Sequence, residues 1–249
     1  MIDIVAVMGM HRSGTSSLAG ILKHSGIYFH ESNEFNRFNK RGNQEANTIV
    51  EVNDNILSSA GLTWLTAKAN TNYSISEKDI KMYLYYLENA KKTGNNACIG
   101  FKDPRFTILC DLIVQNLNEK YNFHFVGTYR HPIQVAMSIT KRQKIIKIDE
   151  GFESWLNYNQ KLFEIIKRNN SPLVYFSNLH NIYKIEVSLL INHLEKKIKS
   201  KLNIHQGLSF FYQDLQNQNS INDEQIPKDC SDLLKELHEY RYSWLEKII

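Results

Sequence analysis

The chain has 249 residues, 42% of them hydrophobic and 22% charged, which is typical of a globular protein with one sizeable core. Its formal net charge of +4 is compatible with an anionic small ligand and too modest to indicate a nucleic-acid-binding protein. The three cysteines are widely separated and predict neither a disulfide framework nor a zinc site, and no apolar run approaches the roughly 20 residues of a membrane span. With no signal peptide evident, we expect a single cytoplasmic domain over residues 1–249.

The N-terminal residues 3–20 have the pattern of a strand, a tight loop and a helix. Residues 4–8 are apolar and partly β-branched, as in a strand buried on both faces, and a helix is expected over residues 15–25. Gly9 and Gly14 enclose the loop between them. Its backbone N–H groups would converge on the positive end of the helix, and such a turn binds phosphate-like oxyanions.

This loop almost matches the Walker A pattern G-x-x-x-x-G-K-[ST]. Gly9, Gly14 and Ser16 are in place, but Thr15 occupies the position of the phosphate-binding lysine, so the cationic role would fall to Arg12. The missing lysine argues against an ordinary ATPase or kinase and leaves the anion site intact. A glycine-rich turn without a ligand is the alternative.

The remaining elements alternate along the chain. We expect helices near residues 45–60, 76–92, 104–120, 132–143, 152–168, 183–199 and 231–248, and strands near residues 97–101, 122–129 and 172–176. This alternation predicts an α/β fold with a parallel sheet covered on both faces, in which residues 45–92 form a helical excursion. Residues 28–44 are expected to form a long loop with substrate contacts, and residues 200–229 are expected to be mostly irregular.

Positive residues follow three of the predicted strands. Arg12 follows the first, Lys102 and Arg105 follow the second, and Arg130 follows the third. Ligands of open parallel sheets bind beyond the carboxyl ends of the strands, so these residues predict a polyanionic ligand at one sheet edge. Each of them taken alone could instead be a solvated loop charge.

With these residues assembled, the chain resembles the sulfotransferases that use 3′-phosphoadenosine 5′-phosphosulfate (PAPS). The sequence from Gly9 to Ser16 resembles their 5′-phosphosulfate loop in its bacterial and Golgi-type form, Arg-Ser-Gly-Thr. Residues 125–132 followed by Ser138 resemble their 3′-phosphate motif, with the matching eight-residue spacing from Arg130 to Ser138. Two weaker matches are Lys102-Asp103-Pro104-Arg105 and residues 172–179, where Phe176 and Ser177 replace the usual acidic residue. The resemblance covers residues 3–200, and the C-terminal glycine-rich nucleotide motif of the cytosolic enzymes is absent.

The resemblance implies a three-layer P-loop-like fold with a central parallel sheet, and an enzyme that transfers a sulfuryl group from PAPS to an acceptor hydroxyl. A carbohydrate or glycan precursor is the expected acceptor, and adenosine 3′,5′-bisphosphate is the product. The residues implied in donor binding are Arg12, Ser13, Gly14, Thr15 and Ser16 for the 5′ end, with Arg130 and Ser138 for the 3′-phosphate. The family needs no divalent metal, and no nucleic-acid partner is expected.

Several residues could take the proton of the acceptor hydroxyl. Glu45 is preferred, because residues 42–45 resemble a Gly-x-x-Glu stretch that places a glutamate at the acceptor in related enzymes; a helix N-terminal acid is the alternative for it. His11 and His30 follow, with Glu31 and Glu34 as further candidates. Catalytic roles are thus expected for Glu45, Arg12 and His11, and tentative substrate contacts for His30, Glu31, Lys102, Asp103 and Arg105.

Aromatic side chains could line an acceptor site, namely Trp64, Tyr73, Trp155 and Tyr158, although a core position is the more common use and is favoured for Trp155. Two other functions stay open. One is a kinase or nucleoside-triphosphate-binding protein of the same fold, and the other is a non-catalytic nucleotide-binding module. The oligomeric state is not predicted.

Overall fold

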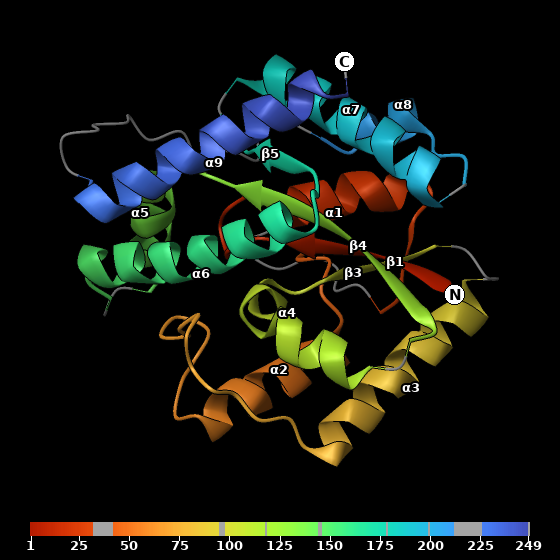
Figure 1. Cartoon of the computed structure of the whole chain (residues 1–249), viewed down its shortest axis with the longest axis horizontal. Helices are drawn as coiled ribbons and strands as arrows, with labels where there is room; N and C mark the ends of the chain where they lie inside the picture. Colours follow the sequence, from red (N-terminus) through yellow and green to blue (C-terminus); the bar gives the residue numbers. More distant parts are fainter. Residues whose placement is uncertain are drawn as a thin grey trace.

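The computed structural model describes residues 1–31, 42–94, 98–117, 119–143, 146–177, 179–198, 200–211 and 226–248. These residues fold around a five-stranded parallel sheet with the strand order β2-β3-β1-β4-β5. The strands are β1 (Ile2–Met8), β2 (Tyr28–Phe29), β3 (Ile99–Lys102), β4 (Tyr121–Tyr129) and β5 (Leu173–Tyr175). Helices cover both faces of the sheet, so the predicted three-layer α/β architecture is confirmed (Figure 1).

The helices form two layers around the sheet (Figure 1). One face carries α1 (Thr15–His24), α7 (His180–Ile198) and α8 (Ile204–Ser209). The other carries α2 (Asn47–Ser59), α3 (Glu77–Thr93), α4 (Pro104–Asn116), α5 (Pro132–Arg142) and α6 (Ile148–Arg168). The last helix, α9 (Lys228–Glu246), packs against α6 and β5 and contributes to both cores. No helix in the described ranges is long and apolar enough to cross a membrane.

The central strand β1 explains why the first apolar run is continuous. Ile4, Ala6 and Met8 lie in the core on one face of the sheet, and Val5 and Val7 lie in the core on the other. All five are fully buried, and β1 pairs with β3 on one side and with β4 on the other. Alternate side chains of a strand point to opposite faces, so a strand covered twice needs apolar residues throughout.

The strand register brings the predicted strand ends together. Val7 of β1 pairs with Lys102 of β3, and Met8 pairs with Gly127 of β4. The segments that follow these strands, including Arg12 and Arg130, therefore leave the sheet at the same edge.

Two short elements were not predicted. The strand β2 lies inside the expected loop at residues 28–44, and its two residues are too few to carry a period. Phe29 packs across Gly100 of β3, where an added Cβ atom would come within 2.1 Å of the Phe29 ring. The helix α8 lies in the segment expected to be irregular. Residues 32–41 and 212–225 of these two segments lie outside the described residues.

The helices α3 and α6 begin where capping hydrogen bonds form, and this position does not always agree with the start of the apolar pattern in the sequence. The predicted cap of α3 is confirmed, because the Asp79 backbone N–H donates to Ser76 Oγ at 3.1 Å. The helix α6 begins at Ile148, earlier than expected, where the Glu150 carboxylate accepts a hydrogen bond of 2.8 Å from the Lys147 backbone N–H. The helix α2 begins at Asn47, so Glu45 lies before it.

A buried ion pair fastens α9 to the rest of the fold. Arg241 Nη2 lies 3.2 Å from Glu186 Oε1 of α7, and their side chains are 5% and 4% exposed. Glu186 Oε2 also accepts a hydrogen bond of 3.2 Å from the backbone N–H of Tyr175 in β5. A charge removed from such a pair leaves its partner buried and uncompensated.

We predict that Arg241→Met lowers the free energy of unfolding by about 3–5 kcal/mol, because Glu186 loses its buried counter-ion. Urea unfolding followed by circular dichroism measures this loss. The matched control on α9 is Lys235→Met, because Lys235 and its partner Glu239 are mostly exposed and 3.9 Å apart. The control should change stability by less than about 1 kcal/mol. Equal effects of the two substitutions would contradict the structural role of the buried pair.

Candidate active site

The loop between β1 and α1 is held in place by its two glycines. Gly9 has φ +141°, and an added Cβ atom would lie 2.2 Å from the backbone oxygen of Thr128 in β4. Gly14 has φ +86°, and its added Cβ atom would lie 2.3 Å from the ring of Phe176. Only glycine fits these two positions, since any side chain would be strained and would also collide. The loop is thereby packed against the ends of the neighbouring strands.

Arg12 connects the β1–α1 loop with Ser138 of the second motif, which lies far from the loop in the sequence. Its backbone has φ +68°, in the left-handed region that non-glycine residues seldom adopt. Its Nε donates a hydrogen bond of 2.9 Å to the hydroxyl oxygen of Ser138 on α5. The loop and the second predicted phosphate motif are therefore contiguous in space.

Arg130 follows β4 and is almost fully buried. Its Nε donates to Gln134 Oε1 at 2.9 Å, and its guanidinium carbon lies 5.5 Å from the centre of the Phe176 ring. Burial, followed by the charge of Arg12, lowers the pKa of Arg130 to about 10. The two positive guanidinium groups repel each other, and an anion bound between or beside them would relieve that repulsion.

Lys102 connects three separate segments from the end of β3. Its ammonium group donates to Ser16 Oγ at 3.2 Å, to the backbone oxygen of Asn43 at 2.9 Å and to Glu45 Oε1. The side chains of Lys102 and Glu45 are 1% and 10% exposed, so this is a buried ion pair. Glu45 lies directly before the N-cap of α2, whose first turn contains no acidic residue, and its carboxylate contacts Lys102.

The Asp103 and Arg105 side chains tie α4 to its surroundings. Asp103 Oδ1 accepts hydrogen bonds from the backbone N–H and the Nη1 of Arg105, at 2.8 and 3.0 Å. Arg105 Nε donates to Asp54 Oδ1 of α2 at 2.6 Å. Burial opposes the charge of Arg105, but the attraction of Asp103, Asp54 and Glu45 outweighs it and raises the pKa of this guanidinium.

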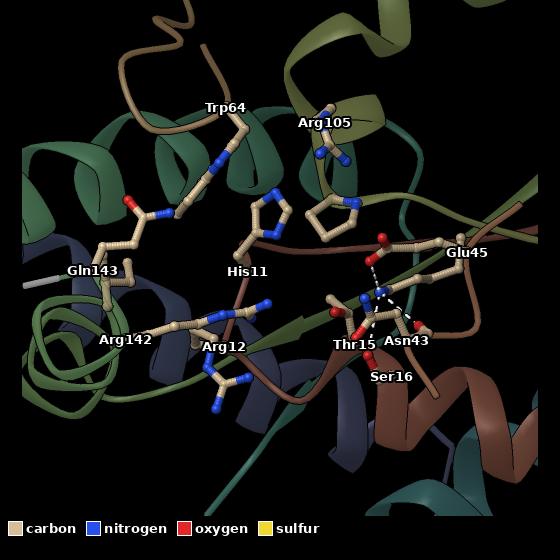
Figure 2. A pocket seen from close by; sticks show the side chains of 13 residues that line it. His11, Arg12, Thr15, Ser16, Asn43, Glu45, Trp64, Arg105, Arg142 and Gln143 are labelled. Atoms are coloured by element: carbon tan, nitrogen blue, oxygen red, sulfur yellow. Dashed lines mark hydrogen bonds and ion pairs between the residues drawn. The ribbon is translucent and has the colours of Figure 1, made fainter. Parts of the chain in front are cut away.

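Several of these residues, among them Arg12, Lys102, Glu45 and Arg105, line a cavity at the carboxyl edge of the sheet (Figure 2). Its lining consists of His11, Arg12, Thr15, Ser16, Asn43, Glu45, Trp64, Lys102, Pro104, Arg105, Ile139, Arg142 and Gln143. The cavity volume of about 170 Å³ is smaller than the roughly 300–1,000 Å³ of pockets that enclose a drug-sized ligand. A cavity of this size is too small to enclose a whole nucleotide.

His11 lies at the centre of this cavity (Figure 2). Its ring centre is 4.5 Å from that of Trp64 and 6.2 Å from that of Tyr158. Its Nε2 is buried and has no hydrogen-bond partner among the described residues. Burial lowers the pKa of His11 well below its ordinary value, and the nearby charges lower it further, namely those of Arg105, Lys102, Arg142 and Arg12. The imidazole is therefore neutral near pH 7, the form in which one of its ring nitrogens is an acceptor.

Other predicted residues lie apart from the cavity lining. His30 Nε2 is 3.5 Å from Glu31 Oε1 at the end of β2, and Glu31 accepts a hydrogen bond of 3.2 Å from Thr48. Glu34 lies outside the described residues. Among the aromatic candidates Trp64 lines the cavity, whereas Trp155 is fully buried, as expected for a core residue.

The sequence patterns missed several residues of the lining, above all Arg142 and Gln143. Arg142 lies one helical turn after Ser138 on α5, so projecting the helix from Ser138 would have found it. The described residues hold no group of three or more His, Cys, Asp or Glu side chains arranged to bind a metal ion.

No family model matches the sequence, and no curated protein matches it. Among solved structures, the sulfotransferase domain from the curacin biosynthetic pathway matches with a TM-score of 0.57 and 12% identity, covering 96% of this chain and 98% of that one. The sulfotransferase domain from the Synechococcus PCC 7002 olefin synthase matches with a TM-score of 0.49 and 14% identity, covering 98% of this chain and 94% of that one. The first match shows that the chain has the fold of a sulfotransferase domain over nearly its whole length.

The depressed pKa of His11 predicts a pH dependence of stability. Between the folded value and the unfolded value of about 6.5, the unfolded chain binds more protons, so this contribution is present above pH 6.5 and is lost as the pH falls. Urea unfolding at pH 7.5 and 5.5 should therefore show a larger loss of stability for the wild type than for His11→Asn. The exposed His205 supplies the control, His205→Asn, whose pH profile should follow the wild type. Parallel profiles for the wild type and His11→Asn would contradict the burial of a neutral imidazole.

Proposed function

We propose that the chain transfers a sulfuryl group from PAPS to the hydroxyl group of an acceptor. The observation that carries the proposal is the hydrogen bond of 2.9 Å from Arg12 to Ser138, which makes the β1–α1 loop and the Arg130 site neighbours. A donor with anionic groups on both its 5′ and its 3′ positions matches two adjacent anion sites. The fold shared with a sulfotransferase domain supports the same assignment.

In this proposal the two sites divide the donor between them. The positive end of α1, with the N–H groups of residues 14–16 and the side chains of Arg12, Thr15 and Ser16, binds the 5′-phosphosulfate. Arg130 and Ser138 bind the 3′-phosphate, for which a guanidinium fork is well shaped. Gathering Arg12 and Arg130 in a buried site costs free energy, as the lowered pKa of Arg130 indicates, and a bound polyanion would offset that cost.

The rival kinase function is less well supported. Thr15 replaces the lysine that would hold the terminal phosphates of a nucleoside triphosphate. Lys102 is the lysine of the cavity lining, but its ammonium group already donates hydrogen bonds to three acceptors and so does not replace the missing loop lysine.

The proposed reaction is an in-line displacement. The acceptor oxygen forms a bond to sulfur as the bond from sulfur to the bridging oxygen breaks, and that oxygen keeps the electron pair on the 5′-phosphate of the leaving adenosine 3′,5′-bisphosphate. The acceptor proton passes to a base. Fixed cations and N–H donors stabilise the charge that spreads over the peripheral oxygens.

For the base, the geometry favours His11 over Glu45. His11 is held by burial in its neutral form, and its Nε2 has no hydrogen-bond partner within the described part of the chain. Glu45 also faces the cavity, but Lys102 holds its Oε1. We assign proton transfer to His11, and to Glu45 the positioning of Lys102 against Ser16.

A sugar hydroxyl remains the proposed acceptor. The indole face of Trp64 and the amide groups of Asn43 and Gln143 line the same cavity, and sugars commonly pack on aromatic faces while hydrogen-bonding to amides. The matched sulfotransferase domain belongs to the curacin biosynthetic pathway, so an acceptor other than a sugar is the alternative.

We predict that Arg130→Ala weakens the binding of adenosine 3′,5′-bisphosphate by roughly 1.5–3 kcal/mol, the range for hydrogen bonds to charged groups. Calorimetry without magnesium measures this. Arg168→Ala, at an exposed arginine of α6 outside the cavity lining, should leave the affinity unchanged. Magnesium-dependent binding of ATP together with no affinity for the bisphosphate would refute the proposed function.

A second test of the proposed function measures turnover with labelled PAPS and a panel of glycans. His11→Gln should lower kcat at least about 100-fold, the lower end for loss of a general base, while bisphosphate affinity stays within about twofold. Glu45→Gln should lower kcat less and should also lower stability, because it removes the partner of Lys102. A severe loss in Glu45→Gln alone would identify Glu45 as the base. Tight nucleotide binding without turnover of any acceptor would favour the non-catalytic module.

A further inference from the structure

Two cations of the cavity lining, Lys102 and Arg105, are already held by neighbouring acceptors. The ammonium group of Lys102 has three donors, and its three hydrogen bonds to Ser16, Asn43 and Glu45 use all of them. Arg105 directs its Nε to Asp54 and its Nη1 to Asp103. Lys102 therefore has no donor left over, and two of the three guanidinium nitrogens of Arg105 are held by carboxylates.

Arg12 alone does not neutralise the negative charge at the reacting end of the proposed donor. A 5′-phosphosulfate carries two negative charges, one on the phosphate and one on the sulfate. The end of α1 supplies about half a positive charge, and Arg12 leans towards the 3′ side through its bond to Ser138. Thr15 supplies no charge at the position where related loops have lysine. The sulfuryl oxygens therefore require a cation from outside the loop.

Arg142 is placed to supply that cation. It lies in the last turn of α5, four residues after Ser138, so both side chains project from the same side of the helix. Figure 2 shows its side chain extending from α5 into the cavity towards His11 and next to Arg12. Its charge lowers the pKa of both His11 and Arg12, after the larger effect of burial, which places the guanidinium within electrostatic reach of the base and of the loop. Arg142 thus approaches from the side opposite to Glu45 (Figure 2).

We propose that Arg142 binds the oxygens of the transferring sulfuryl group, in place of the lysine that the loop lacks. This inference rests on the proposed function. The planar guanidinium can donate to two sulfuryl oxygens at once while the bond from sulfur to the bridging oxygen breaks and the bond to the acceptor forms. His11 takes the acceptor proton, and the bisphosphate leaves with the electron pair. Lys102 and Arg105 then hold the walls of the cavity, and Arg142 binds the sulfuryl group that is transferred.

The test compares ligands with and without the sulfuryl group, and it needs no acceptor. Calorimetry measures the affinities of wild type, Arg142→Gln and Arg142→Lys for PAPS and for adenosine 3′,5′-bisphosphate, and the slow hydrolysis of bound PAPS reports transfer to water. Arg142→Gln should bind the bisphosphate within about twofold of wild type, bind PAPS about tenfold or more weakly and hydrolyse it more slowly, because charge-assisted hydrogen bonds to the sulfuryl group are lost. Arg142→Lys should recover part of the loss.

The matched control is Lys141→Gln, which removes the same charge from the neighbouring exposed residue of α5 that is not part of the cavity lining. It should leave both affinities and the hydrolysis rate unchanged. An equal weakening of bisphosphate and PAPS in Arg142→Gln would overturn the inference and assign Arg142 to general nucleotide binding. Unchanged affinities and hydrolysis would also overturn it. A wild type that binds neither nucleotide would instead overturn the proposed function itself.

Discussion

Positive charge gathered at one edge of a parallel sheet is the constraint on which the rest of this structure depends. The strand register brings the ends of β1, β3 and β4 together, and each is followed by a cation. These cations repel one another, and the fold compensates their charges to different extents. Lys102 has Glu45 as a buried counter-ion, and Arg105 has Asp103 and Asp54. Arg12 contacts a hydroxyl group and Arg130 lies against an aromatic ring. Burial and the charge of Arg12 together lower the pKa of Arg130, so the repulsion is felt beside the loop.

The fold could be predicted from the sequence because its signals are local, and the two proposed anion-binding motifs are local as well. A continuous apolar run between two layers of helices has to be a buried strand, and glycine spacing marks the loop after it. The contact of Arg12 with Ser138 spans 126 residues, and the pair of Lys102 with Glu45 spans 57. Such pairings depend on how helices pack around the sheet, which no local period encodes. Glu45 therefore looked like a free base in the sequence and is held by Lys102 in the structure.

Phe176 stands where the sulfotransferase pattern has an acidic residue, and its contacts show what the ring does at this position. The resemblance places an acidic residue there, and this chain has a ring that lies against Arg130 and closes over Gly14. A carboxylate at this position would attract Arg130 and compete with a bound phosphate. The ring instead shields the guanidinium from water, which strengthens its interaction with an anion.

The packing of Phe29 across Gly100 links the short strand β2 to its neighbour β3. The ring occupies the space that a side chain on β3 would need, so a large residue can stand at only one of the two positions. Through evolution, positions 29 and 100 are therefore expected to change together, with a gain in volume at one matched by a loss at the other. The pairing of β2 with β3 at this edge of the sheet therefore depends on two residues that lie 71 positions apart in the sequence.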